Sequence, residues 1–180
     1  MPILFLMNLQ SFIREIPGFP KKGILFYDIT PLLKSPMAFR YSVQQWKNHF
    51  SGKVVHKIVS MESRGFIFGG ALAHEMNIGF IPIRKERKLP FRTISQNFDL
   101  EYRSNEKMEM HADALFPGET VLIVDDVLAT GGTAQAACSL VEKAGATVSG
   151  IGFLIELTHL NGRKKLEKYD VVSLLQYDKG

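Results

Sequence analysis

The segment VLIVDDVLATGGT, residues 121–133, constrains the fold more than any other part of the chain. It begins with an apolar run, Thr120 to Val124, that is typical of a strand buried in a parallel sheet. Two acids follow, then a loop of small residues, and then a segment that predicts a helix from Thr133. Ligands of open α/β sheets bind at the carboxyl ends of the strands, so we expect Asp125 and Asp126 at the binding edge.

The loop after these acids has the composition of a phosphate site. Gly131 and Gly132 allow a tight turn that brings backbone N–H groups close to an anion, and the helix that follows points its positive dipole end at the same place. Threonine hydroxyls on either side add donors. The residues expected to hold the phosphate are Ala129, Thr130, Gly131, Gly132 and Thr133. Carboxylates repel phosphate but accept hydrogen bonds from sugar hydroxyls, so the whole segment predicts a site for a ribose 5-phosphate.

Competing phosphate motifs are not found in the sequence. It contains neither G-x-x-x-x-G-K-[ST] nor G-x-G-x-x-G, which excludes a P-loop and a dinucleotide fingerprint. The plainer alternative is a glycine-rich turn after a core strand with two solvated aspartates. A bare Gly-Gly pair would favour that alternative, whereas the complete segment favours the phosphate site.

Strand and helix patterns alternate through the rest of the chain. Ser35-Pro36 predicts a helix start, and Gly145 predicts a helix end. Residues 20–31 are expected to form a turn, a short strand and a turn, and residues 84–107 a long loop or a flexible hairpin. Helices are expected over 9–16, 36–50, 65–76 and 133–144, and strands over 57–60, 79–83, 120–124, 147–157 and 171–175. This order predicts one α/β domain, residues 1–180, with a parallel sheet and helices on both faces.

Composition excludes several classes of protein. The single cysteine, Cys138, cannot form an internal disulfide; it is expected to be a core thiol and fits a reducing cytoplasm. No apolar run approaches the roughly 20 residues that span a bilayer, so we expect no membrane partner. The five histidines show no ligand spacing, which argues against a protein-bound zinc.

The net charge of +4 is compatible with nucleic acid or with a polyanionic small molecule. Part of this charge is concentrated in one basic cluster, and no aromatic-basic interleaving supports nucleic-acid binding. We therefore expect a phosphate pocket. The cluster consists of Arg84, Lys85, Arg87, Lys88 and Arg92.

The segment 121–133 resembles the phosphoribosyl pyrophosphate motif of the type I phosphoribosyltransferases. Three further segments resemble the adenine-specific members of that family: IPGFPKKGILFYDITPLL at 16–33, ESRGFIFGGALA at 62–73 and IRKERKLP at 83–90. The likeness continues in ELTHLNGRKKL at 156–166 and so covers nearly the whole chain. It implies the type I phosphoribosyltransferase fold, with residues 1–33 as a small N-terminal hood and base-binding segment and residues 34–180 as the core.

The resemblance also implies roles for charged residues. Arg64, in a turn with a cis peptide between Glu62 and Ser63, would bind pyrophosphate, as would Arg84 and Lys88. Their neighbours Lys85 and Arg87 are expected to be solvated. In the long loop, Glu101 would exchange a proton with the purine ring.

For the base pocket, the resemblance implies that Phe26 stacks on the purine, with Leu25 beside it and Leu157 on the other side. The alternative is that a strand from Ile24 to Ile29 buries the same residues as plain core. Tyr27 departs from the family, in which many members carry arginine or another residue at this position, so the sequence leaves base recognition open here.

The reaction that the resemblance implies is adenine plus phosphoribosyl pyrophosphate giving AMP and pyrophosphate, in purine salvage. Mg²⁺ would arrive with the pyrophosphate, held mainly by substrate oxygens, and the protein would be a homodimer. Two alternatives stay open at this point. The purine could be hypoxanthine, guanine or xanthine, or the chain could be a non-catalytic regulator that senses the sugar diphosphate.

Overall fold

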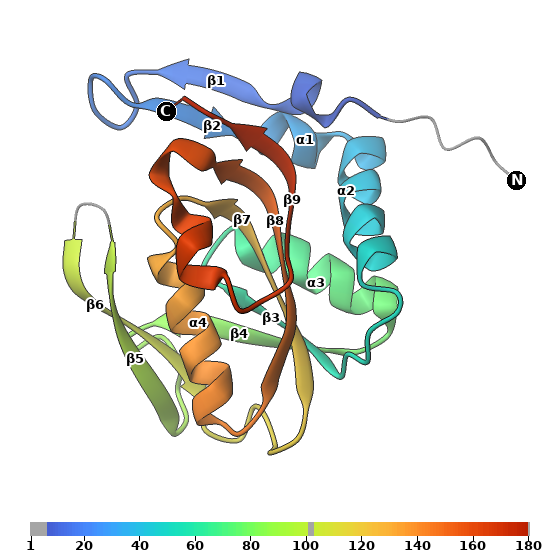
Figure 1. Cartoon of the computed structure of the whole chain (residues 1–180), viewed down its shortest axis with the longest axis vertical. Coiled ribbons are helices and arrows are strands. Elements are labelled where there is room, and N and C mark those ends of the chain that lie inside the picture. The colour runs from blue at the N-terminus through green and yellow to red at the C-terminus, as the bar shows by residue number, and fades with distance from the viewer. Residues whose placement is uncertain (1–6, 101–102, 180) are drawn as a thin grey trace, which may run out of the picture.

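The computed structural model describes residues 7–100 and 103–179, and a seven-stranded sheet forms its centre (Figure 1). The strand order is β5-β6-β4-β3-β7-β8-β9. The strands from β4 to β9 along this order pair in parallel, whereas β6 and β5 form an antiparallel edge. The bounds are β3 Lys57–Met61, β4 Gly79–Lys85, β5 Thr93–Leu100, β6 Arg103–His111, β7 Thr120–Leu128, β8 Thr147–Leu157 and β9 Val171–Tyr177. The predicted parallel α/β sheet is confirmed.

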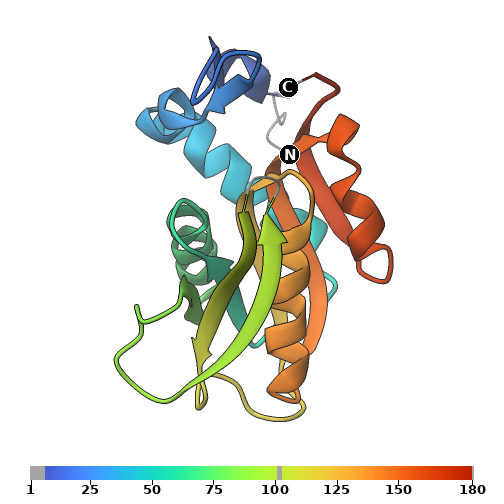
Figure 2. The ribbon, with the colours of Figure 1, turned by 90° about the vertical axis from the view of Figure 1, so that its left-hand side faces the viewer.

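Helices cover both faces of the sheet, as the alternating pattern predicted (Figures 1 and 2). The helices α2 (Pro36–His49) and α3 (Gly65–Met76) lie on one face, and α4 (Gly132–Lys143) lies on the other. In β7, Leu122 and Val124 pack with the first pair of helices, whereas Val121 and Ile123 pack with α4. Burial of both strand faces explains why this run is apolar at every position.

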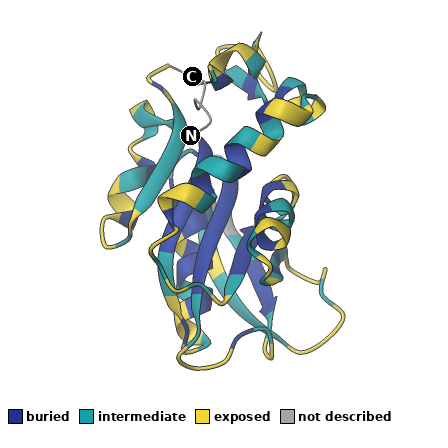
Figure 3. Ribbon diagram, turned by 90° about the vertical axis from the view of Figure 1, so that its right-hand side faces the viewer, coloured by how far each residue is buried: buried dark blue, intermediate teal, exposed yellow. Residues whose placement is uncertain are grey.

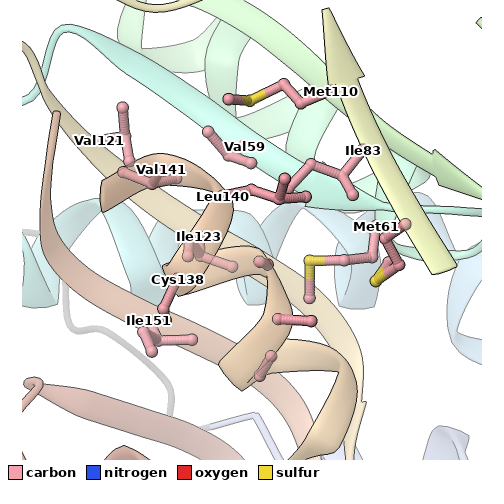
Figure 4. Packing of buried hydrophobic residues seen from close by; sticks show 14 of the residues in the cluster. Val59, Met61, Ile83, Met110, Val121, Ile123, Cys138, Leu140, Val141 and Ile151 are labelled. Atoms are coloured by element: carbon pink, nitrogen blue, oxygen red, sulfur yellow. The ribbon is translucent and has the colours of Figure 1, made fainter. Parts of the chain in front are cut away.

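The α4 face is a close-packed apolar layer (Figure 4). Leu140 and Val141 of the helix lie in one cluster with Val59 and Ile123 of the sheet, and all four are fully buried. Cys138 lies in the same cluster, so its prediction as a core thiol is confirmed, and burial raises the pKa of this thiol to about 12. Figure 3 shows the contrast between the buried central strands and the exposed turns.

Helix ends follow their local sequence signals. The Ser35 hydroxyl accepts a hydrogen bond from the Ala38 N–H at 3.3 Å, with Pro36 in the first turn, so the predicted start of α2 is confirmed. After α4, Gly145 adopts a positive φ of 80°, the conformation expected of a residue just beyond a helix end.

The hood, residues 7–33, differs from the expectation for its first part. The helix predicted over 9–16 is wrong: a short 3₁₀ helix, η1 (Leu9–Phe12), is followed by the strand β1 (Arg14–Pro17). This strand pairs antiparallel with β2 (Leu25–Asp28), and the pairing satisfies backbone groups that a helix would otherwise have satisfied. The two strands form a separate sheet, drawn at the top of Figure 1.

Two further boundaries correct the expectation. Pro31 lies in the first turn of a short helix, α1 (Thr30–Lys34), rather than in a turn, because proline is compatible with the start of a helix. The segment 84–107 is not a long loop. Its first residues extend β4 to Lys85, and β5 and β6 form the hairpin that was the other expectation.

Candidate functional site

A cavity of about 550 Å³ lies where the hood meets the carboxyl ends of β3, β7 and β8. It is lined by side chains that are far apart in the sequence, from the hood, from the turn after β3 and from the end of β7. The lining residues are Ile24, Leu25, Phe26, Tyr27, Glu62, Ser63, Arg64, Asp125, Asp126, Val127, Ala129, Thr133 and Leu157. The fold therefore collects most of the expected site residues around one space.

The two acids lie within β7, which continues to Leu128, and not after the end of a strand at Val124 as expected. Asp125 and Asp126 keep only 8% and 6% of their surface exposed, so the alternative of two solvated aspartates is wrong. Asp125 Oδ1 accepts a hydrogen bond from the Asp126 N–H at 2.9 Å. Burial, and then the charge of Asp126, raises the pKa of Asp125 well above its usual range.

Arg64 lies at the start of α3 and contacts two other parts of the site. Its Nε donates to Asp126 Oδ2, and its guanidinium lies 5.6 Å from the centre of the Phe26 ring. Nearly half of the Arg64 side chain, 47%, is still exposed, so further donors remain accessible to a ligand. The peptide bond between Glu62 and Ser63 is cis, as the resemblance implied.

The loop 129–133 turns from β7 into α4. Gly131 has a φ of 78° and precedes α4, which begins at Gly132, one residue before the expected start. No side chain caps this helix start within the described part of the chain, so its first N–H groups suit an anion. Ala129 and Thr133 line the cavity. The remaining loop residues, Thr130 to Gly132, are not among its lining residues, and Gly132 faces a neighbouring cavity of about 390 Å³.

Arg84 and Lys88 lie beside the cavity and are not among its lining residues. Arg84 forms a forked ion pair with Glu62, through Nε at 3.2 Å and Nη2 at 3.3 Å, and its Nη1 donates to the Lys88 carbonyl at 3.2 Å. Burial alone would raise the pKa of Glu62, but hydrogen bonds from Arg84 and from the Lys85 N–H hold that pKa below its usual value. Lys85 and Arg87 are exposed, as expected.

All four residues expected in the base pocket line the cavity: Leu25, Phe26, Tyr27 and Leu157. Tyr27 is also part of the core, with 7% of its surface exposed. Its hydroxyl donates to the Lys179 carbonyl at 2.6 Å, and its ring packs on Tyr177 with centroids 4.0 Å apart. The hydroxyl proton of Tyr27 is thus bonded within the protein.

The chain is similar to known proteins over nearly its whole length. The family model described as "Phosphoribosyl transferase domain" matches residues 37–178. The adenine phosphoribosyltransferase of Maridesulfovibrio salexigens is 54% identical over 170 residues, which cover 94% of this chain and 99% of that protein. The crystal structure of the adenine phosphoribosyltransferase from Thermoanaerobacter pseudethanolicus superposes with a TM-score of 0.90 at 49% identity, covering 94% of this chain and 98% of that one. The enzyme from Saccharomyces cerevisiae, solved with adenine and an imino-altritol bisphosphate, has a TM-score of 0.88 at 38% identity and covers 93% and 96% of the two chains.

The chain belongs to the adenine phosphoribosyltransferase family.

Glu101, the expected acid at the purine, lies outside the described residues. Among the residues that the structure does describe, no group of three or more His, Cys, Asp or Glu is arranged to hold a metal ion. Over the same residues, no helix is long and apolar enough to cross a membrane.

Sequence reasoning missed two groups of residues around the site of this family member. Glu62 was assigned no contact in the sequence, but it pairs with Arg84, 22 positions further along the chain. No local sequence signal indicates that pairing. Gly162 was also missed, although it lies against the loop 129–131. A signal existed for its surroundings, since Glu156 and Arg163 lie seven positions apart in a segment of the family pattern.

Proposed function

We propose that this chain transfers the 5-phosphoribosyl group from phosphoribosyl pyrophosphate to adenine, giving AMP and pyrophosphate in purine salvage. The observation that carries the proposal is the single cavity in which paired carboxylates, an accessible arginine and an apolar hood strand meet. A phosphorylated sugar and a flat base need these three kinds of surface side by side.

The sugar half of the substrate is assigned to β7 and the loop after it. Residues 129–133 hold the 5-phosphate through backbone N–H groups, hydroxyls and the start of α4. Asp125 and Asp126 accept hydrogen bonds from the ribose hydroxyls. They also oppose the positive charge that develops at C1′ as its bond to pyrophosphate breaks.

The leaving group is assigned to the turn after β3 and the basic cluster. Arg64 offers a planar fork of donors to pyrophosphate oxygens, and Arg84 and Lys88 add positive charge beside it. Magnesium would supply charge neutralisation at the pyrophosphate and, as the family resemblance implies, would be held mainly by phosphate and ribose oxygens of the substrate.

The base is assigned to the hood. Phe26 and Leu25 pack on one face of adenine and Leu157 on the other, and all three line the cavity. As the bond from C1′ to the purine nitrogen forms, the ring loses a proton, which Glu101 accepts. Closure of the hairpin over the cavity excludes water, which would otherwise hydrolyse the activated sugar.

The proposal also covers domain organisation, oligomeric state and localisation. The chain acts as one domain, with residues 1–33 as hood and base-binding segment and residues 34–180 as core, and it works as a homodimer in the cytoplasm.

A turnover assay with each purine, phosphoribosyl pyrophosphate and magnesium tests the activity. Release of pyrophosphate with adenine and no comparable release with hypoxanthine, guanine or xanthine is the expected result. Turnover of hypoxanthine in place of adenine overturns the substrate assignment. Tight binding of the sugar diphosphate without turnover of any purine overturns the assignment as an enzyme and favours a non-catalytic sensor.

A further inference from the structure

The turn at residues 161–163, where the 3₁₀ helix η3 (Gly162–Leu166) begins, lies directly against the loop 129–131. A methyl group added at Gly162 would meet the Ala129 carbonyl and would lie 2.8 Å from the Gly131 nitrogen. Conversely, a methyl group added at Gly131 would lie 2.5 Å from the Gly162 carbonyl oxygen. Real Cβ contacts are not this short, so the two turns are in backbone contact with no room between them. A shift of one turn toward the other must displace the loop.

A charged cluster fixes the position of this turn. Arg163 donates from Nε to Glu156 Oε1 at 2.9 Å, from Nη2 to Glu156 Oε2, and from Nη1 to the Val171 carbonyl at 2.8 Å. The Ser173 hydroxyl donates to Glu156 Oε2 at 2.7 Å. The turn is thereby tied to β8 and β9, the two strands at its side of the sheet.

The Glu156 carboxylate is buried, with 5% of its surface exposed. Burial by itself would raise the pKa of Glu156, but hydrogen bonds from Arg163 and Ser173 outweigh it and lower that pKa. The ion pair is therefore charged at neutral pH. A forked arginine–carboxylate pair of this kind fixes geometry more strictly than a single hydrogen bond does.

We propose that Gly162 and the Glu156–Arg163 pair are positioning residues that set the geometry of the loop 129–131 and hence the affinity for the ribose 5-phosphate. Neither Gly162 nor Arg163 lines the cavity, so both act through the loop and not on the substrate. The inference rests on the proposed function, because it takes the loop as the 5-phosphate site.

The first test compares two ligands that differ only in the phosphate. AMP and adenosine are titrated against the wild type, Gly162→Ala and Lys164→Ala, the last being an exposed neighbour that serves as control. Loss of one hydrogen bond to a charged group weakens binding by about tenfold to about 100-fold, so Gly162→Ala, which displaces the donors of the loop, is expected to weaken AMP binding by that factor. Adenosine affinity should stay within about twofold, since it does not use the loop. Unchanged AMP affinity, or equal weakening of both ligands, overturns the proposal.

A second test separates positioning from general stability. Arg163→Met leaves a buried carboxylate without its partner and is expected to lower the Tm, whereas Glu156→Gln/Arg163→Met removes that charge and should recover much of the Tm. Both variants lose the hydrogen bonds from Arg163 to Glu156 and to the Val171 carbonyl. The KM for phosphoribosyl pyrophosphate should therefore be raised in both variants, and the KM for adenine should change much less. A KM that recovers together with the Tm in the double variant shows a merely structural role and overturns the proposal.

Failure of this inference is distinguishable from failure of the proposed function. A wild type that does not turn adenine over, but whose AMP affinity depends on Gly162, overturns the activity and supports the positioning role. A wild type that turns adenine over with no effect of Gly162→Ala on AMP supports the activity and overturns the positioning role.

Discussion

The guanidinium of Arg64 lies 5.6 Å from the centre of the Phe26 ring, so the turn after β3 and the hood are in direct contact. The same side chain donates to Asp126 at the end of β7. One arginine therefore contacts both Phe26, which is proposed to stack on the base, and Asp126, which is proposed to bind the ribose. Because its fork has five N–H donors, these contacts leave others for phosphate oxygens.

Replacement of Arg64 by lysine tests the fork itself. Arg64→Lys keeps the positive charge but loses the planar set of donors, so kcat/KM for phosphoribosyl pyrophosphate should fall by about 100-fold, as for loss of one preorganised donor. Steady-state kinetics with saturating adenine measures this, and Arg40→Lys on the exposed side of α2 is the control. Equal kcat/KM for the two variants contradicts the assignment.

Gly65 and Gly70 offer a matched pair within α3. A methyl group at Gly65 would lie 2.5 Å from Asp125 Oδ1, whereas one at Gly70 would meet nothing within 4 Å. Gly65→Ala should displace the Asp125 carboxylate and lower kcat/KM by at least about tenfold. Gly70→Ala should leave kcat/KM unchanged and stabilise the helix by about 0.5–1 kcal/mol. If both variants behave alike in turnover and thermal unfolding, the close approach to Asp125 has no catalytic consequence.

The raised pKa of Asp125 predicts a pH dependence of stability. Burial and the charge of Asp126 disfavour the ionised form in the folded state, so stability is present below the unfolded pKa, near 3.8, and is lost as pH rises through the folded value. Asp125→Asn carries no such charge. Its Tm should match that of the wild type below pH 3.8 and exceed it by a growing margin as pH rises above that value, while turnover falls. Thermal unfolding of both proteins across this pH range measures the difference in Tm. A difference that shrinks as pH rises would contradict a raised pKa of Asp125.

Replacement of Tyr27 tests whether this departure from the family pattern affects recognition of the purine base. Its hydroxyl donates to the Lys179 carbonyl, so Tyr27→Phe should destabilise the fold by about 0.5–1.5 kcal/mol, the usual contribution of one hydrogen bond. The ratio of kcat/KM for adenine to that for hypoxanthine should not change, because the ring stays in place on Tyr177. A changed purine preference with unchanged stability would reverse this assignment.

The role of Glu101 remains a prediction from the family resemblance. Glu101→Gln removes a proton acceptor with little change of shape, so the rate of the chemical step should fall by about 100- to 10,000-fold, as for loss of a general acid–base. Affinity for phosphoribosyl pyrophosphate should be nearly intact. Single-turnover kinetics and a binding titration measure the two quantities separately, and loss of binding would show that Glu101 has a different task.

Local sequence patterns predicted those elements whose structure depends mainly on their own residues. The all-apolar run before Asp125 predicted a strand buried on both faces, and Ser35-Pro36 predicted the start of α2. The first element of the hood was mispredicted, because apolar residues spaced from Leu9 to Ile16 fit a helix equally well until β2 pairs with that segment. Strand pairing is a nonlocal interaction, so a sequence window cannot weigh it against a helix.

The sequence alone determined which chemical groups this protein has to offer: a glycine-rich loop with the composition of a phosphate site, two acids beside it, a basic cluster and an apolar segment that is proposed to bind a base. Tertiary structure decided how these parts meet. The sheet brings the acids, the turn at Arg64 and the hood to one cavity, and buries Asp125 enough to raise its pKa. Only the folded chain places Gly162 against Gly131. The reason is that burial, charge coupling and backbone contact depend on distances between residues, and those distances are set by packing across the whole fold.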